Sequence, residues 1–187
     1  MKTETDLVTS LDHAFDRAQE VIAGVRPEQY GDATPCEEWS VHQLMEHLIG
    51  VVDRIGAGVS RSTPARFLLG PDPASQFRTA AAAALAGWRT PGVMDEVIDA
   101  VAAGPMPGRV LAGINLLDTA THSWDLATAT GQPAELPEDV ATAALEVSGQ
   151  IARPSSAPVA SVPSGRHRPM PTPPSASSHS WGVSPER

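Results

Sequence analysis

Cysteine is almost absent from this chain, which has Cys36 as its one example among 187 residues. A single cysteine cannot form a disulfide within the chain. It also excludes a structural zinc site made of several thiolates from one chain. We therefore expect a reducing compartment, and we interpret the protein as cytoplasmic.

Basic residues are also scarce. The chain has 13 lysines and arginines against 22 acids, a formal charge of −9, and Lys2 as its only lysine. This charge disfavours binding to nucleic acid or to an anionic membrane surface. No stretch approaches the ~20 apolar residues that span a bilayer, and no apolar run follows the charged N-terminus. We expect neither a nucleic-acid partner nor a membrane partner.

The alternation of apolar and polar residues that marks a half-buried strand is missing as well. Apolar residues instead recur every three or four positions, and this predicts helices over residues 7–25, 41–59, 73–88, 110–130 and 137–151. On 110–130, we assign the apolar side to Val110, Ile114, Leu117, Thr121 and Trp124. The sequence thus predicts an all-α bundle of four main helices with an extra C-terminal helix.

Local signals support several of these helix ends. Ser40 and Gln43 stand three residues apart, as in a capping box. Pro73 fits the first turn of its helix, and Gly131 is placed to end the fourth helix as its C-cap. We expect one helical domain over residues 1–151.

The composition changes after residue 151. Residues 152–187 hold eight prolines and nine serines, and four arginines against one acid give them a net charge of +3. The preceding residues therefore carry −12. Such a segment cannot bury a core, so we predict a disordered tail. An out-of-frame read of GC-rich DNA after a helix would have the same composition, so a frameshift product is a second hypothesis for 152–187.

Three polar residues fall on predicted inner faces. His47 lies among the apolar residues of its helix, and Asp118 and His122 are four apart on one face of another. A buried carboxylate needs compensation, and a divalent cation supplies it. Two histidines and one carboxylate suit zinc, nickel or iron and leave coordination positions open. By spacing alone, hydrogen-bonded core residues are the alternative to a metal site.

Two motifs resemble a known family. Residues 34–41 (TPCEEWSV) with 47–50 (HLIG) resemble the opening motif of mycothiol-dependent maleylpyruvate isomerase-like proteins. Residues 122–127 (HSWDLA) with 129–132 (ATGQ) are similar to a signature of a short actinobacterial branch of that family. The resemblance implies a DinB-like four-helix bundle around a metal, with zinc favoured and with His47, Asp118 and His122 as ligands.

The chain departs from the better known members of that family in two ways. Asp118 stands where they have a glutamate, and no counterpart of their C-terminal domain is recognised in the sequence. We therefore expect chemistry at the level of the family rather than the maleylpyruvate isomerase reaction itself.

Several neighbouring residues receive secondary interpretations. Cys36 is expected to pack, partly buried, rather than to act as a nucleophile. Trp39 and Trp124 are expected to pack near helix ends, with the wall of a substrate pocket as the alternative for an indole. Asp125 is a candidate hydrogen-bond acceptor for a ligand imidazole or for Trp124, with a cap on a neighbouring backbone group as the alternative.

Three functions are compatible with this reading. The first is a thiol transferase or isomerase-like enzyme in which the metal activates mycothiol against a small electrophile. The second is a metal-dependent hydrolase of an amide or ester. The third is a non-catalytic bundle that binds a metal, a small ligand or a second copy of itself as a homodimer.

Overall fold

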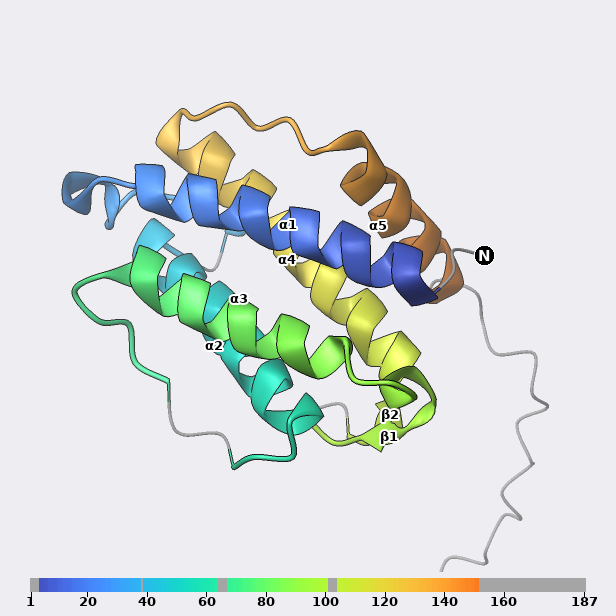
Figure 1. The fold of residues 1–187 in the computed structure, drawn as a ribbon. Coiled ribbons are helices and arrows are strands. Elements are labelled where there is room, and N and C mark those ends of the chain that lie inside the picture. The colour runs from blue at the N-terminus through green and yellow to red at the C-terminus, as the bar shows by residue number, and fades with distance from the viewer. Residues whose placement is uncertain (1–3, 38, 64–66, 101–103, 152–187) are drawn as a thin grey trace, which may run out of the picture. The chain divides into compact units, whose positions relative to one another are not determined.

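Helices form in all five segments that carry helical apolar spacing (Figure 1). The structure is a computed structural model, and it describes residues 4–37, 39–63, 67–100 and 104–151. The five α-helices are α1 (Glu4–Gly24), α2 (Val41–Val59), α3 (Pro73–Trp88), α4 (Gly108–Thr130) and α5 (Glu138–Ile151). The all-α prediction is confirmed. The predicted disordered tail, 152–187, lies outside the described residues.

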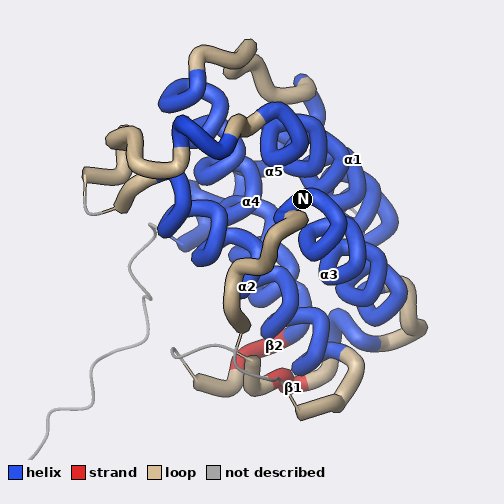
Figure 2. The backbone as a smooth tube through the Cα atoms, turned by 90° about the vertical axis from the view of Figure 1, so that its left-hand side faces the viewer, coloured by secondary structure: helices blue, strands red, loops and turns tan. Residues whose placement is uncertain are grey.

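Four of these helices form a closed ring in which α1 packs on α3, α3 on α2, α2 on α4 and α4 on α1. Figure 2 shows them nearly end-on, with α5 lying against α1 and α4. Helices α2 and α3 run parallel, because Gly56 lies against Ala84 and Gly87 lies against Val59. The centre of the ring is filled by large, fully buried side chains, among them Leu11, Leu48, Phe77, Trp88 and Leu116.

The predicted helix signals are present as hydrogen bonds and backbone angles. Ser40 and Gln43 form a reciprocal capping box at the start of α2. Pro73 occupies the first turn of α3. Gly131 ends α4 in the left-handed conformation, with φ of 69°, which a residue without a Cβ adopts at little cost.

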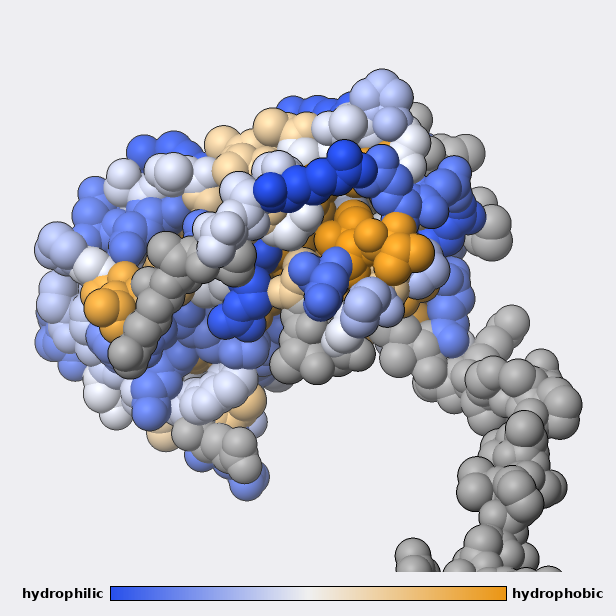
Figure 3. All heavy atoms as spheres, turned by 90° about the horizontal axis from the view of Figure 1, so that it is seen from below, coloured by the Kyte–Doolittle hydropathy of each residue, from blue (hydrophilic) through white to orange (hydrophobic). Residues whose placement is uncertain are grey.

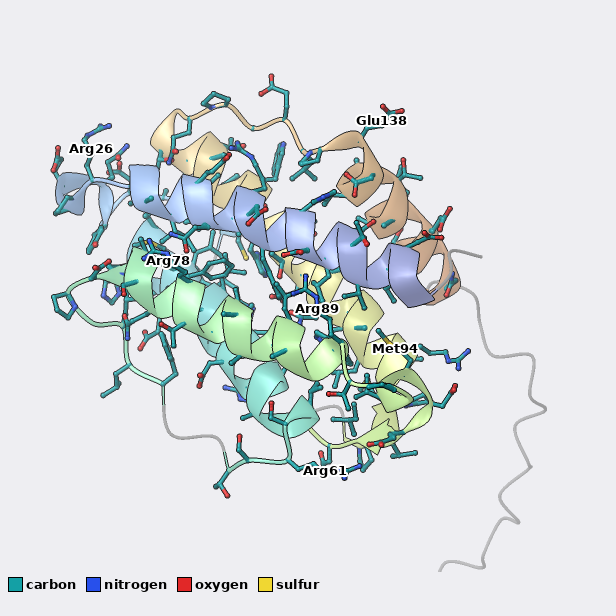
Figure 4. The ribbon with its side chains drawn as sticks, in the orientation of Figure 1. Arg26, Arg61, Arg78, Arg89, Met94 and Glu138 are labelled. Atoms are coloured by element: carbon teal, nitrogen blue, oxygen red, sulfur yellow. The ribbon has the colours of Figure 1, made fainter. Side chains whose placement is uncertain are left out.

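A small hairpin precedes α4, and the sequence did not predict it. Strand β1 (Val97–Ile98) pairs antiparallel with β2 (Met106–Pro107). Two residues per strand are too few to display alternation. Gly108 follows directly, and a Cβ there would lie 2.2 Å from the carbonyl oxygen of Val93, so only glycine fits where α4 begins. Met94, labelled in Figure 4, is buried in this corner.

The apolar side predicted for α4 was wrong. Val110 and Trp124 are 42% and 43% exposed, and Thr121 is exposed, while Ile114 and Leu117 are only half-buried. The buried residues lie on the opposite side, at Leu111, Ala112, Asn115, Leu116, Thr119, Ala120, Ser123, Leu126 and Ala127. Because α4 packs against α1, α2 and α5, it buries a broad face rich in small and polar residues. A single apolar stripe is a poor guide to such a helix.

The surface is polar, with isolated apolar residues. The exposed large apolar side chains of the described residues are Leu68, Val97, Val110, Trp124 and Leu145. Figure 3 shows, on the face seen from below, small apolar areas among polar ones. Scattered apolar residues of this kind are ordinary for a folded domain. Within the described segments, no helix combines the length and apolar character needed to cross a membrane.

Candidate metal centre

Three predicted ligand side chains meet between α2 and α4. The Nε2 atom of His47, on α2, lies 3.3 Å from Oδ1 of Asp118, on α4. One turn further along α4, Nε2 of His122 lies 3.6 Å from the same oxygen. One ligand atom from each residue lies within 4.8 Å of the other two. The fold therefore brings the three residues together, although His47 and Asp118 are 71 positions apart in the sequence.

The local structure of both helices explains this meeting. His47 follows Leu44 by three positions and precedes Leu48, and both leucines are fully buried in the contact with the bundle. This places His47 at the margin of the buried face of α2, where its side chain is 30% exposed. Asp118 and His122 share one face of α4 because they are four residues apart. The site is thus half-buried and reached from the His47 side, since the side chain of His122 is only 14% exposed.

A second carboxylate fixes the ring of His122. Oδ2 of Asp125 lies 3.1 Å from Nδ1 of His122, and Asp125 is buried. An ionised carboxylate only accepts hydrogen bonds, so Nδ1 must carry the hydrogen. In the neutral ring, Nε2 then presents its lone pair toward Asp118 and His47. Asp125 thus contacts the imidazole of His122, as expected, and the assignment of His122 as a metal ligand stays a prediction.

The donor set fits a divalent cation. Oδ2 of Asp118 is buried and has no hydrogen-bond partner. An unsatisfied buried polar atom costs about 1–3 kcal/mol, and more when it is charged. Two imidazole nitrogens and one carboxylate oxygen are ligands that zinc, nickel and iron accept. A cation held by Asp118 would offset the cost of its carboxylate.

Trp39 lies over the two histidine rings. Its ring centroid is 4.3 Å from that of His47, with a 32° angle between the planes, and 5.7 Å from that of His122. The two histidine rings meet edge to face at 4.9 Å. Trp39 stands directly before the N-cap of α2 and packs against the core, so the packing expected near a helix end is confirmed. The indole also borders the grouped side chains, and a role as the wall of a substrate pocket stays a prediction.

The loop before α2 holds Trp39 in this position. The Thr34 hydroxyl lies 2.9 Å from the carbonyl oxygen of Cys36 and 2.8 Å from that of Trp39. The Trp39 amide also donates to the Cys36 carbonyl. Cys36 is half-buried in this turn, as expected, and it is not one of the three grouped ligands. Thr34, Cys36 and Trp39 thus shape the rim of the site.

One other indole and two other histidines of the described residues are not among the three grouped side chains. Trp124 is 43% exposed, so the expectation that it packs at a helix end was wrong. His13 is exposed and pairs with Asp139 of α5 at 2.8 Å. His42 lies against the ring of Tyr30. None of these belongs to the group of ligand atoms around Asp118.

The sequence reasoning overlooked two polar residues beside the site. Asn115 and Thr119 are fully buried on α4, and the amide oxygen and nitrogen of Asn115 and the hydroxyl of Thr119 have no partner. Asn115 and Thr119 precede His122 by seven and three residues, a spacing that places all three on one face of a helix and could have indicated them. It was missed because the apolar side of α4 had been assigned to the opposite face.

Comparison with known proteins gives a consistent picture. The family model described as the mycothiol maleylpyruvate isomerase N-terminal domain matches residues 11–127. Two uncharacterized proteins of Mycobacterium tuberculosis, from strains CDC 1551 and H37Rv, are each 35% identical over 148 residues, covering 75% of this chain and 79% of each relative. The crystal structure of a mycothiol-dependent maleylpyruvate isomerase aligns with a TM-score of 0.48 at 13% identity, covering 76% of this chain and 70% of that one.

Proposed function

Because the chain belongs to the family of the mycothiol maleylpyruvate isomerase N-terminal domain, we propose that His47, Asp118 and His122 bind a divalent metal ion. Zinc is the first candidate, with nickel and iron as alternatives. The family predicted from the two sequence motifs is correct. The observation that carries the proposal is the convergence of two Nε2 atoms, from His47 and His122, on Oδ1 of the Asp118 carboxylate.

We further propose a thiol transferase or isomerase-like enzyme that acts on a small electrophile, with mycothiol as the thiol. A divalent ion supplies a lowered thiol pKa, so that thiolate is present near neutral pH. In an addition to an activated double bond, the thiolate sulfur would bond to the electrophilic carbon while the π bond of that carbon opens. The electron pair would pass to the neighbouring atom, which takes a proton from solvent in place of the proton that the thiol released. Three protein ligands are fewer than the four of a closed structural zinc site, which favours a site that accepts a small molecule.

The chain's own residues would orient the reactants. Asp125 holds the ring of His122, and the loop before α2 holds Trp39 against His47. The indole offers an apolar wall that excludes water on one side of the site. The chemistry needs no protein thiol, so we expect Cys36 to be dispensable.

Metal content tests the binding proposal. Elemental analysis of gently purified protein should find close to one equivalent of metal, and H47A and H122A should each lose most of it. H42A is a matched control, because His42 is on the same helix and contacts Tyr30 instead of Asp118. Wild-type protein with only traces of metal, or H47A and H122A with undiminished metal, would contradict the proposal.

A cobalt-substituted protein separates the functions. If a thiol is the co-substrate, mycothiol or a thiol mimic should change the visible spectrum of the cobalt form. A hydrolase should instead turn over generic esters without any thiol. Absence of both responses would favour a non-catalytic metal-binding bundle.

A further inference from the structure

Unpartnered polar atoms are concentrated beside the proposed metal centre. Among the described residues, six buried side-chain atoms lack a hydrogen-bond partner, and four of them belong to Asn115, Asp118 and Thr119 of α4. The other two lie singly on α1 and α3, at Gln19 and Trp88. Asn115 and Thr119 are both fully buried. Buried polar groups are usually paired, so this cluster requires a physical explanation.

The four atoms form complementary pairs. The donors are the amide nitrogen of Asn115 and the hydroxyl of Thr119, and the acceptors are Oδ1 of Asn115 and Oδ2 of Asp118. Two hydrogen bonds, one from Thr119 to Asn115 and one from Asn115 to Asp118, would therefore use all four atoms. No atom would be left over.

Helix geometry brings these residues together. Residues three and four apart are neighbours on a helix, so Asp118 and Thr119 both adjoin Asn115. Side chains on a helix lean toward its N-terminus. Asp118 and Thr119 therefore lean back toward the turn that carries Asn115.

We propose that Asn115 and Thr119 are positioning residues that hold the Asp118 carboxylate in its metal-binding orientation. In the metal-bound protein, the Thr119 hydroxyl would donate to Oδ1 of Asn115 and Nδ2 of Asn115 would donate to Oδ2 of Asp118, all four atoms being unpartnered in the structure. Oδ1 of Asp118 would stay directed at the two histidines, where it lies in the structure. This inference rests on the proposed metal binding. In this proposal, Asn115 orients the Asp118 carboxylate by a hydrogen bond, as Asp125 orients the ring of His122.

Asn115→Leu separates positioning from simple packing. The substitution removes both polar atoms of Asn115 and keeps its branched shape and its number of heavy atoms. We expect the metal-free protein to unfold at the same temperature as wild type or higher, because unpaired buried atoms are gone. We expect the dissociation constant for Zn²⁺ or Co²⁺, measured by competition with a chromophoric chelator, to rise about 10–100-fold. The visible spectrum of the cobalt form should also change.

Thr119→Val and a double variant test whether Thr119 acts on Asp118 through Asn115. T119V should weaken metal binding less than N115L does. Because Thr119 acts through Asn115, adding T119V to N115L should weaken binding no further. Gln19→Met is the matched control, since it removes an unpaired buried oxygen on α1 and should leave metal affinity unchanged.

Three results would overturn the proposal: wild-type metal affinity in N115L, full additivity of N115L and T119V, or an equal loss of affinity in Q19M. If N115L does not fold, N115A provides the same affinity measurement. Failure of this proposal is distinct from failure of the metal site. A wild type that binds one equivalent of metal, lost in H47A but retained at full affinity in N115L, refutes only the role of Asn115.

Discussion

At the scale of single residues, the centre depends on how each ligand is held. Asp125 determines which nitrogen of His122 carries the hydrogen, and so which nitrogen faces Asp118. Trp39 restricts the ring of His47 by lying against it at a tilt of 32°. Metal sites commonly rely on such outer contacts, since a free imidazole must lose rotational freedom before it binds.

The substitution Asp125→Asn tests the first of these contacts. Asparagine keeps the size of the side chain but offers an NH₂ group that can face Nδ1, so the hydrogen on His122 is no longer fixed. We expect metal affinity to fall about 10–100-fold, as for other supporting residues of metal sites. Chelator competition measures this, and the cobalt spectrum reports the changed ligand field. Unchanged affinity in D125N would show that the Asp125 contact does not support the site.

At the scale of helices, α4 carries two of the three proposed ligands, and α2 carries the third, His47. Its capping box fixes where the helix begins, and this sets the direction of His47 two turns later. The same loop carries Trp39, and the backbone of Val41 and His42 bonds back to Asp32 and Tyr30. The start of α2 therefore links the stability of the helix to the geometry of the ligand and of the indole.

Loss of the α2 cap should destabilise the fold modestly. In Ser40→Ala, the Gln43 amide loses its side-chain acceptor, and we expect the free energy of unfolding to fall by about 1 kcal/mol. Ser148→Ala is a matched control inside α5, where the hydroxyl bonds only to the Leu145 carbonyl and alanine favours the helix. Urea unfolding followed by circular dichroism measures both. Equal stability of S40A and S148A would argue against a stabilising cap.

At the scale of the whole molecule, α5 closes over α1 and α4. Its Val140 side chain is fully buried with Ala14 and Ala120, and His13 of α1 contacts Asp139 at the helix start. Ion pairs also join segments far apart in sequence, such as Arg89 with Asp12 between α3 and α1 (Figure 4). Such exposed pairs each contribute little, so the apolar core carries most of the stability.

The pair of His13 and Asp139 predicts a pH dependence. Partial burial raises the pKa of Asp139, but the hydrogen bond and charge of His13, with further bonds from Val140 and Ser10, outweigh it and hold the pKa below the usual value. A lowered folded pKa stabilises the protein above the unfolded pKa of about 3.9, and this contribution is lost as pH falls through the folded pKa.

We therefore expect Asp139→Asn to lower the melting temperature near pH 6 and to converge with wild type at the lowest pH. Glu138→Gln is the control, because Glu138 is a neighbouring, exposed acid of the same first turn that points away from the bundle (Figure 4). Thermal melts between about pH 2.5 and pH 6 measure the difference. A gap between D139N and wild type that stays constant down to the lowest pH would contradict the assignment.

The sequence by itself determined the helices and the identity of the candidate ligands. Helical spacing, the Ser40 cap, Pro73 and Gly131 are local signals, because they depend on contacts within a few residues of the chain. The same is true of the turn that separates Asp118 from His122. The motifs around His47 and His122 identified the family because each is a contiguous stretch that can be recognised without knowing the fold.

Only the tertiary structure decided which faces meet. The pairing of His47 with Asp118, the position of Trp39 and the buried side of α4 all depend on which helices become neighbours. A helix with three neighbours buries several faces at once, so its apolar spacing does not reveal which residues turn inward. Asn115 and Thr119 became visible as unpartnered groups for this reason, because an unmet hydrogen bond is defined by its surroundings rather than by its position in the chain.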